Sequence, residues 1–399
     1  MNILVINAGS SSLKYQLINM DNESVIAKGI CEKIGLADSF CVHKCKGNEI
    51  KLVHKMPTHK EAMQLVLDAL THKEYGAIES MDEIAAVGHR VLHSGEDFTD
   101  SVLVTDEVMQ ICEKNKPLGP LHMGPNISGV YACQEVMPNA PMALVFDTSF
   151  HLTMPAYAYM YALPYEDYEK YKIRRYGFHG TSHKFVSGEA AKFLCKDFNK
   201  IKMITTHLGN GSSLAAIKDG KVIDTSMGFT PLEGLPMGTR TGDIDPACLE
   251  FLASKTGKDI HELLLYANKK SGMLGLSGIS SDFRDLREAA NNGNQRAQLA
   301  LDVFAYHVKK YIGSYVAALG GLDVLVFTAG VGENDVDVRK AATSNLEYLG
   351  IYIDQEKNAQ RNNGQPRIIS TDDSPVTVVV VPTNEELVIA RETKRLAKL

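Results

Sequence analysis

The chain has 399 residues, a formal net charge of −6 at pH 7, 44% hydrophobic and 23% charged residues, as expected of a globular protein long enough for two domains. No basic stripe offers a footprint for nucleic acid, the N-terminus lacks the pattern of a secretory signal, and no apolar run reaches the length of a membrane helix. With seven cysteines and no C-x-x-C pair, the chain is predicted to be a reduced, cytoplasmic protein without nucleic-acid or membrane partners.

The chain opens on a predicted hairpin in residues 3–18. An apolar strand ends at Asn7, a turn with one glycine and three serines follows, and a second apolar strand carries Lys14. Such a turn can surround a phosphate, because glycine lets backbone N–H groups point inward and serine adds hydroxyl donors. The same form returns roughly 200 residues later, as a strand over 203–208, a turn over 209–213 and a strand over 214–217.

Strands and crossover helices alternate in both halves of the sequence, which predicts an α/β fold. Residues 1–56 have the pattern of short strands, and Thr58 opens a helix with Glu61 as its capping-box partner. Further strands are predicted at 85–89, 142–146, 322–327 and 376–381, and further helices at 105–115, 122–137, 186–194, 246–255, 258–270, 283–291, 294–319 and from about 384 onward. The domain boundary is expected in 151–171, and the two hairpins predict a duplication with a nucleotide between the halves. Two ordinary Ser/Gly hairpins are the competing interpretation.

Two arginines in glycine-flanked turns are candidates for anion binding. Arg90 follows a predicted strand in GHRVLHSG, and Arg240 lies in GTRTGD. Arginine presents a planar, permanently charged fork to a carboxylate or phosphate, and two arginines could stabilise charge that spreads in a transition state. Surface or ion-pair arginines are the alternative interpretation, which the small residues around both positions weaken.

Three more polar side chains lie at predicted strand or helix ends. His179 lies between glycines just before a helix, where a neutral imidazole could donate to a phosphoryl oxygen; a capping or packed histidine is the alternative. Asp147 at the end of an apolar strand and Glu385 in PTNEE are separated carboxylates, and Mg²⁺ takes one or two carboxylates with water and phosphate oxygens. For Glu385 the alternative is an acidic residue that only stabilises the start of a helix.

Two segments could frame a nucleotide. Residues 330–334 (GVGEN) follow an apolar strand, and glycines there let a ring or ribose approach the backbone. In residues 281–285, Arg284 could stack on a base and Asp282 could accept from a hydroxyl. A plain strand–helix turn is the alternative for the first segment, and neither segment decides the function alone.

These segments, taken in order, resemble the acetate kinase family within the acetate and propionate kinase group. The resemblance runs from NAGSSSLKYQL at 7–17 to PTNEELVIARET at 382–393. Between them lie DTSFHLTMP at 147–155, RRYGFHGTSH at 174–183, HLGNGSS at 207–213, DTSMGFTPLEG at 224–234, MGTRTGDIDP at 237–246 and FTAGVGEN at 327–334. Long words in a fixed order are far more specific than any single motif.

The resemblance implies two duplicated ribonuclease-H-like domains of the actin, sugar kinase and Hsp70 type, with an interdomain active-site cleft. Residues 1–150 would form the N-terminal actin-like domain, on which a C-terminal helix over about 384–399 packs. Residues 151–383 would form the nucleotide-binding and dimerisation domain of a homodimer. The implied reaction is the reversible, Mg²⁺-dependent transfer of the γ-phosphoryl of ATP to acetate, giving acetyl phosphate and ADP, with Mn²⁺ as a second metal that could serve.

The resemblance also implies roles for individual residues. Arg90 and Arg240 would hold the acyl carboxylate and the transferring phosphoryl, and His179 would stabilise the phosphoryl in flight. The metal region would comprise Asn7, Asp147 and Glu385, and the pocket for the acetate methyl Val91, Leu121 and Pro231. The nucleotide and its phosphates would lie along Lys14, His207, Leu208, Gly209, Asn210, Gly211, Asp282, Phe283, Arg284, Gly330, Val331, Gly332, Glu333 and Asn334.

The chain departs from the family pattern at two places. The family usually reads RVVHGGE where residues 90–96 read RVLHSGE, and Leu92 adds a methylene near the acyl pocket. This should favour short acids but leaves the chain length of the acid open. Pro236 replaces a frequent methionine beside the Arg240 loop and is expected to stiffen that loop.

The implied chemistry needs little from covalent catalysis. A carboxylate is already a nucleophile at pH 7, so no general base is required, and cations lower the barrier between two approaching anions. We predict direct transfer, with a phosphoenzyme at Glu385 or His179 as the alternative. A propionate kinase would use the same residues. A sugar kinase would need Asp147 as a base, and a non-enzymatic actin-like protein would lose both arginines, so these two rank lower.

Overall fold

The computed structural model describes residues 1–120 and 122–399, and the chain forms two compact units. Unit 1 comprises residues 1–150 and 384–399, and unit 2 comprises residues 151–383. Each unit is built on one mixed sheet with helices packed against it, which confirms the predicted α/β class. Within the described ranges, no helix combines the length and the apolar character that a membrane crossing requires.

The sheet of unit 1 joins an antiparallel meander to parallel strands, in the order β5-β4-β3-β2-β1-β6-β8-β7. Strands β1 and β8 are apolar nearly throughout, and all residues of β8 are buried, as is typical of strands inside a sheet that is covered by helices. In β4 buried and more exposed residues alternate instead. The strands are β1 Asn2–Ala8, β2 Ser12–Asn19, β3 Ser24–Glu32, β4 Phe40–Cys45, β5 Asn48–Val53, β6 Ile84–Val91, β7 Val102–Leu103 and β8 Met142–Phe146.

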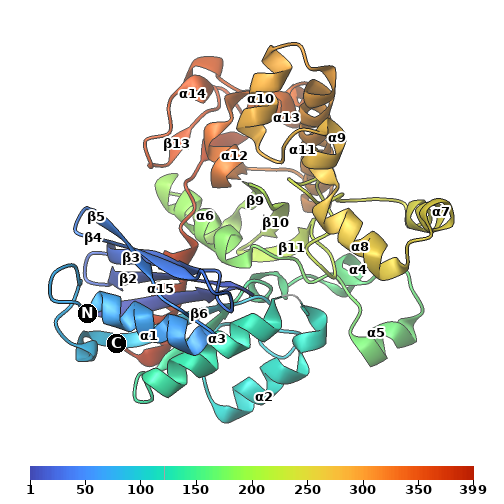
Figure 1. The fold of residues 1–399 in the computed structure, drawn as a ribbon. Helices are drawn as coiled ribbons and strands as arrows, with labels where there is room; N and C mark the ends of the chain where they lie inside the picture. Colours follow the sequence, from blue (N-terminus) through green and yellow to red (C-terminus); the bar gives the residue numbers. More distant parts are fainter. Residues whose placement is uncertain (121) are drawn as a thin grey trace. The chain divides into compact units, whose positions relative to one another are not determined.

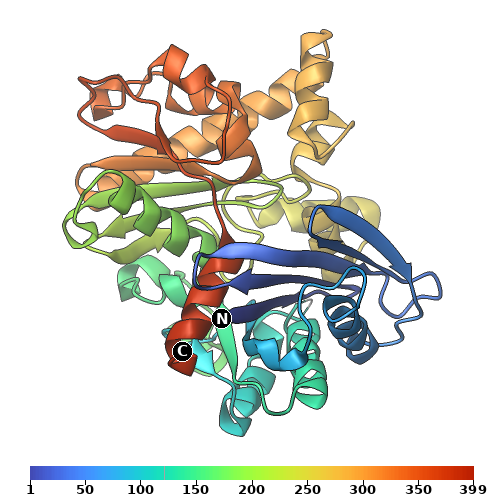
Figure 2. The same cartoon turned by 90° about the vertical axis from the view of Figure 1, so that its left-hand side faces the viewer.

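Helices cover both faces of this sheet. Helices α1 (His59–Leu70) and α3 (Met123–Val136) pack side by side on one face, where the larger core of unit 1 lies (Figure 1). The predicted capping box of Thr58 and Glu61 opens α1. Helix α15 (Glu385–Ala397) packs on β1, β6 and β8, as the red helix in Figure 2 shows. The remaining helices of unit 1 are α2 Asp106–Lys114 and the 3₁₀ turns Met81–Glu83 and Lys116–Leu118.

The sheet of unit 2 repeats the central arrangement of unit 1. An antiparallel meander, β11-β10-β9, continues into strands β12 and β14, which are parallel to β9. The first three strands of unit 1, followed by β6 and β8, have the same order and directions. This agrees with the predicted duplication. The strands are β9 Lys202–Leu208, β10 Ser212–Lys218, β11 Lys221–Thr225, β12 Val324–Thr328, β13 Arg367–Ile368 and β14 Thr377–Val380.

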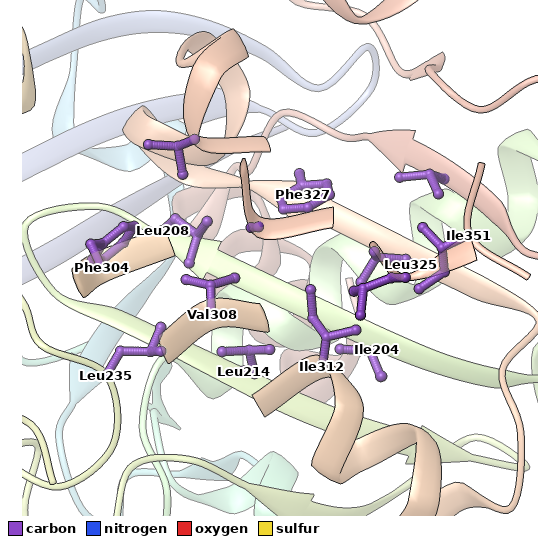
Figure 3. Packing of buried hydrophobic residues seen from close by; sticks show 14 of the residues in the cluster. Ile204, Leu208, Leu214, Leu235, Phe304, Val308, Ile312, Leu325, Phe327 and Ile351 are labelled. Atoms are coloured by element: carbon purple, nitrogen blue, oxygen red, sulfur yellow. The ribbon is translucent and has the colours of Figure 1, made fainter. Parts of the chain in front are cut away.

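The main core of unit 2 lies between this sheet and the long helix α11 (Gln295–Leu319). Phe304, Val308 and Ile312 recur every four residues, so they share one helix face and pack on strand residues such as Leu208 and Phe327 (Figure 3). The other helices are α4 Ala156–Tyr159, α5 Tyr165–Tyr171, α6 Gly180–Phe193, α7 Ala247–Thr256, α8 Ile260–Lys269, α9 Gly272–Ser277, α10 Phe283–Asn291, α12 Ala329–Asn334, α13 Val336–Thr343 and α14 Gln355–Ala359.

The structure corrects two local predictions and one alternative interpretation. Arg90 lies inside β6 rather than after it. Helix α6 begins at Gly180, six residues before the predicted start at 186, because its first turns bury polar residues such as Ser182 and His183 and show no apolar periodicity. The turn that is the alternative interpretation of residues 330–334 is also not found, because residues 329–334 form the short helix α12, which Ala329 enters with a left-handed φ of 62°.

The close contact between β6 and α15 yields a stability prediction. A Cβ on Gly88 would lie 2.6 Å from Ile389 Cγ2 and would also collide with the hydroxyl of Thr393. Gly88→Ala should therefore lower the free energy of unfolding of unit 1 by about 1–3 kcal/mol, measured by urea or thermal unfolding. Gly188→Ala in α6, where nothing lies within 4 Å of the new Cβ, is the control and should be neutral or slightly stabilising. Equal unfolding midpoints for the two variants would contradict the prediction.

Candidate active site

In unit 1, Arg90 is held in a fixed orientation by a carboxylate and an amide. Arg90 pairs with Val145 in the register of β6 and β8, and Asp147 follows β8 directly. Arg90 Nε donates to Asp147 Oδ1 at 3.1 Å, Nη2 donates to Asp147 Oδ2, and Nη1 donates to Asn7 Oδ1 at 3.4 Å. The side chain of Asp147 is 1% exposed and that of Arg90 is 26% exposed. The bidentate pair thus fixes the guanidinium plane while part of it stays accessible.

The charges around Arg90 stabilise its cationic form. Burial alone would lower the pKa of Arg90, but the carboxylates of Asp147, Glu385 and Glu386 raise it above its ordinary value. Glu385 is the first residue of α15, after the N-cap residue Asn384. The predicted metal residues Asn7, Asp147 and Glu385 therefore all surround Arg90 in unit 1.

These carboxylates fit a magnesium ion that is bound mainly by other ligands. No cluster of three or more His, Cys, Asp or Glu side chains suited to a metal occurs in the described part of the chain. Mg²⁺ on nucleotide phosphates needs only one or two carboxylates, because water and phosphate oxygens complete the octahedron. Both oxygens of Asp147 accept hydrogen bonds from Arg90, so this carboxylate orients the guanidinium.

The other predicted residues of unit 1 lie near this cluster or outside the described ranges. Lys14 pairs with Asn7 in the β1–β2 register, and both line a small pocket with Glu386. Val91, the last residue of β6, is 1% exposed. Leu121 lies outside the described residues, so its predicted place in the acyl pocket stays a prediction.

In unit 2, the second hairpin brings His179 and Arg240 together. Gly209 N donates to Gly211 O at 3.1 Å, which closes the turn between β9 and β10. A Cβ on Gly211 would lie 3.1 Å from His179 Nε2 and 3.6 Å from Arg240 Nη1. The absence of a side chain at Gly211 therefore leaves the imidazole and the guanidinium beside the same turn. Asn210 O accepts from Gly238 N at 3.0 Å and ties the turn to the Arg240 loop.

Arg240 has no ionic partner in unit 2. Its Nη1 donates to Pro231 O at 3.2 Å and contacts Met237 Sδ at 3.6 Å, and no carboxylate of the described residues pairs with it. Burial lowers the pKa of Arg240. A partly buried cation without a carboxylate is costly unless it binds an anion. The predicted residue Pro231 thus contacts Arg240 through its carbonyl.

His179 is the N-cap residue of α6 and has a left-handed φ of 57°, which is unusual for a residue with a side chain. Its ring stacks on His207, with centroids 4.1 Å apart and planes inclined by 23°. Its Nδ1 lies 2.9 Å from Ser213 Oγ in β10. Backbone strain of this kind concentrates at functional sites, and here it directs Nε2 toward the turn at Gly211.

A cavity of about 1150 Å³ lies next to this hairpin in unit 2. Its volume and its mixture of apolar and charged residues suit a nucleotide. Eight of the predicted nucleotide residues line it: Gly209, Asn210, Asp282, Phe283, Arg284, Gly330, Val331 and Asn334. The predicted residues Leu208, Gly211, Gly332, Glu333 and His207 are not among the residues that line this cavity.

Two of the lining residues have partners that differ from their expected roles. Asp282 caps α10 and accepts hydrogen bonds from Arg284, which lower the pKa of Asp282 to about 2. The ring of Phe283 is buried against Phe304, with centroids 4.7 Å apart in an edge-to-face arrangement. To bind a ribose hydroxyl, Asp282 would have to share or exchange its hydrogen bonds with Arg284. Phe283 lines the cavity and is also part of the hydrophobic core.

Sequence reasoning missed several residues that support the site. Arg339 is fully buried and donates to Gly332 O at 2.9 Å and to Asn358 Oδ1 at 2.7 Å, so it fixes α12 from behind the cavity. Arg175 binds Glu233 at 2.7 Å and steadies the loop after β11. An arginine in a helix is usually exposed, so nothing in the sequence pattern distinguished Arg339.

The chain is similar to kinases of short-chain acids. The model of the Acetokinase family matches residues 2–391. The acetate kinase of Thermoanaerobacterium thermosaccharolyticum is 58% identical over 399 residues, which cover 100% of this chain and 99% of that protein. The acetate kinase structure of Porphyromonas gingivalis has 47% identity, covers 99% of both chains and gives a TM-score of 0.97. A propionate kinase structure from Francisella tularensis has 41% identity, the same coverage and a TM-score of 0.91.

Proposed function

The chain belongs to the acetokinase family, and from this premise we propose that it transfers the γ-phosphoryl of ATP to acetate, reversibly, to give acetyl phosphate and ADP. The observation that carries the proposal is Arg240, a partly buried cation with no carboxylate partner among the described residues, beside His179 at a glycine turn. The turn borders a cavity of about 1150 Å³, which supports a nucleotide as the phosphoryl donor.

In this proposal each cation acts on an anion of the reaction. The acetate oxygen attacks the γ-phosphorus, and the bond to the β-bridging oxygen breaks, so that oxygen leaves with the electron pair on ADP. Arg240 and His179 stabilise the equatorial oxygens of the phosphoryl group, where charge spreads in a loose transition state. Arg90 binds the acyl carboxylate, and Asp147 keeps its guanidinium in one plane. No residue needs to remove a proton.

Magnesium is the metal that we propose, with manganese as a substitute. Glu385, Asp147 and Asn7 would hold it, directly or through water, together with phosphate oxygens of the nucleotide. The bound ion would neutralise charge on the phosphates. Lys14, in the register position opposite Asn7, adds a positive charge at the same strand end.

We also propose that the protein acts as a homodimer in the cytoplasm. Helices α7 and α8 pack on each other and expose large apolar side chains: Phe251, Ile260, Leu264, Leu265 and Tyr266. Exposed apolar side chains in such a cluster are typical of an association surface. We assign this surface and the dimerisation role to residues 151–383, and the actin-like half of the fold to residues 1–150 with the last helix.

A propionate kinase is the second candidate, because the structure of one is similar to this chain over 99% of its length. Val91 and Pro231 are proposed to face the acyl group, with Leu121, and Leu92 should restrict its length. We expect kcat/KM to be highest for acetate, lower for propionate and lowest for butyrate when acyl phosphate is trapped as the hydroxamate with ATP as donor. A higher value for propionate would assign the second function, and turnover with pyrophosphate alone would overturn ATP as the donor.

Direct transfer predicts one inversion at phosphorus. When the γ-phosphoryl of ATP carries three different oxygen isotopes, or two isotopes and sulfur, the acetyl phosphate formed should have the opposite configuration. A phosphoenzyme at Glu385 or His179 would give two displacements and net retention. Retention would therefore replace the direct mechanism.

Removal of either guanidinium should slow turnover strongly. Arg90→Ala or Arg240→Ala should each lower kcat by roughly 10²–10⁴, as the loss of preorganised charge typically does. Steady-state kinetics of the acyl phosphate assay measures this, with circular dichroism to show that the variants are folded. Arg361→Ala, at an exposed arginine of unit 2, is the matched control and should keep wild-type kcat. A kcat within a few-fold of wild type would remove that arginine from the catalytic group.

A further inference from the structure

Behind His179, a buried chain of hydrogen bonds runs through unit 2. Thr205 Oγ1 lies 2.7 Å from His183 Nδ1, and His183 Nε2 lies 2.8 Å from Ser213 Oγ. Ser213 Oγ in turn lies 2.9 Å from His179 Nδ1. Thr205 is on β9, Ser213 on β10, and the two histidines are at the start of α6. These contacts join Thr205, His183, Ser213 and His179, in that order, into one continuous hydrogen-bonded path, which is called the relay below.

The fold explains why these four side chains meet. Ser213 pairs with His207 and Ala215 with Thr205 in the β9–β10 register, so Thr205 and Ser213 project from the same face of the sheet. Helix α6 packs on that face of β9. Thr205, His183 and Ser213 are each 0% exposed, so the two hydrogen bonds among these three side chains are shielded from bulk water.

The hydroxyl protons fix the direction of the relay. Each hydroxyl has one proton to donate, and a buried hydroxyl rarely leaves it without an acceptor. Apart from the ring nitrogens of the relay, no acceptor for Thr205 or Ser213 is found in the described part of unit 2. Thr205 must therefore donate to His183 Nδ1, since His183 Nε2 is out of its reach.

The remaining protons follow in order. Because His183 Nδ1 accepts, a neutral His183 carries its proton on Nε2 and donates to Ser213. Ser213 then donates its own proton to His179 Nδ1, which leaves the ring proton of a neutral His179 on Nε2. The reverse direction would leave the Thr205 hydroxyl proton buried without an acceptor, which costs roughly as much as a lost hydrogen bond.

We propose that Thr205, His183 and Ser213 are positioning residues that fix the tautomer of His179, so that Nε2–H points to the turn at Gly211 as a hydrogen-bond donor. Nε2 lies next to Gly211 and faces the same turn as Arg240. A donor at this atom binds a phosphoryl oxygen, whereas a lone pair there would repel it. The proton positions follow from unit 2 alone, and their catalytic consequence rests on the proposed function.

The surroundings of the relay favour neutral imidazoles. Burial, followed by repulsion from His151 and His207, keeps the pKa of His183 well below its ordinary value. Burial also lowers the pKa of His151 to about 4. Arg240 Nη1 lies beside the same turn as His179 Nε2 and adds a positive charge there.

A direct test is the tautomer of each ring in the unmodified protein. In protein labelled with ¹⁵N-histidine, long-range ¹H–¹⁵N correlation spectra distinguish Nε2–H, Nδ1–H and the imidazolium form. We expect Nε2–H for both His183 and His179, with the His179 signals assigned by their loss in His179→Gln. An Nδ1–H tautomer or an imidazolium at His179 would overturn the proposal, whatever the protein catalyses.

A kinetic test uses a pair of substitutions at Thr205. Thr205→Val keeps the shape but removes the hydroxyl, and Thr205→Ser keeps the hydroxyl. We expect Thr205→Val to lower kcat by about tenfold, the worth of one lost hydrogen bond in the transition state, with little change in the KM for ATP or acetate. Ser213→Ala should lower kcat at least as much, and Thr205→Ser should retain most of it.

The outcomes separate the relay from the proposed function. If the wild-type protein makes no acyl phosphate while the spectra show Nε2–H at His179, the proposed function fails and the relay stands. If the protein is active but Thr205→Val and Thr205→Ser have equal kcat, or only KM changes, the relay does not act on His179. Thermal unfolding of each variant shows whether a loss of kcat comes from loss of folded protein.

Discussion

The chemistry proposed for this protein depends on positive charge that is held in place before any anion arrives. Arg90 and Arg240 are held in place by different kinds of contact. In unit 1, the carboxylate of Asp147 compensates the charge of the partly buried Arg90 and fixes the plane of its guanidinium through two hydrogen bonds. In unit 2, Arg240 is held only by a backbone carbonyl and a thioether in the described structure, so its charge is uncompensated there. In the proposed reaction a phosphoryl group would supply the compensation, so a strongly anionic partner would be favoured there.

The two hairpins show how one arrangement of strands has diverged. Both connect the first two strands of a meander that continues into parallel strands. The first hairpin contributes a side chain, because Asn7 accepts a hydrogen bond from Arg90. The second hairpin has a glycine in its turn. Because Gly211 has no side chain, it does not cover His179 and Arg240. The shared backbone therefore places a turn at the same strand ends, while the side chains at and beside the two turns differ.

Much of this could be predicted because it depends on local pattern. Apolar runs identified β8 and α11, the capping box identified the start of α1, and glycine turns led to Arg240 and His179. The relay could not be predicted, because Thr205, His183 and Ser213 come from three elements and meet only after the sheet has formed. Arg339 was missed for a related reason. It can be buried because backbone carbonyls of α12 and α14 accept its hydrogen bonds, and no local sequence pattern indicates these partners.

The last helix has a consequence for biosynthesis. Unit 1 is discontinuous: α15 follows all of unit 2 in chain order, yet it covers β1, β6 and β8 of unit 1. During translation these strands emerge early, and one apolar side of their sheet must wait until more than two hundred further residues have been synthesised. In that interval, apolar residues of β1 and β8 such as Val5 and Val145 are not yet covered by α15. The nascent chain should thus depend on chaperones over this period, and unit 1 can mature only after unit 2 has left the ribosome.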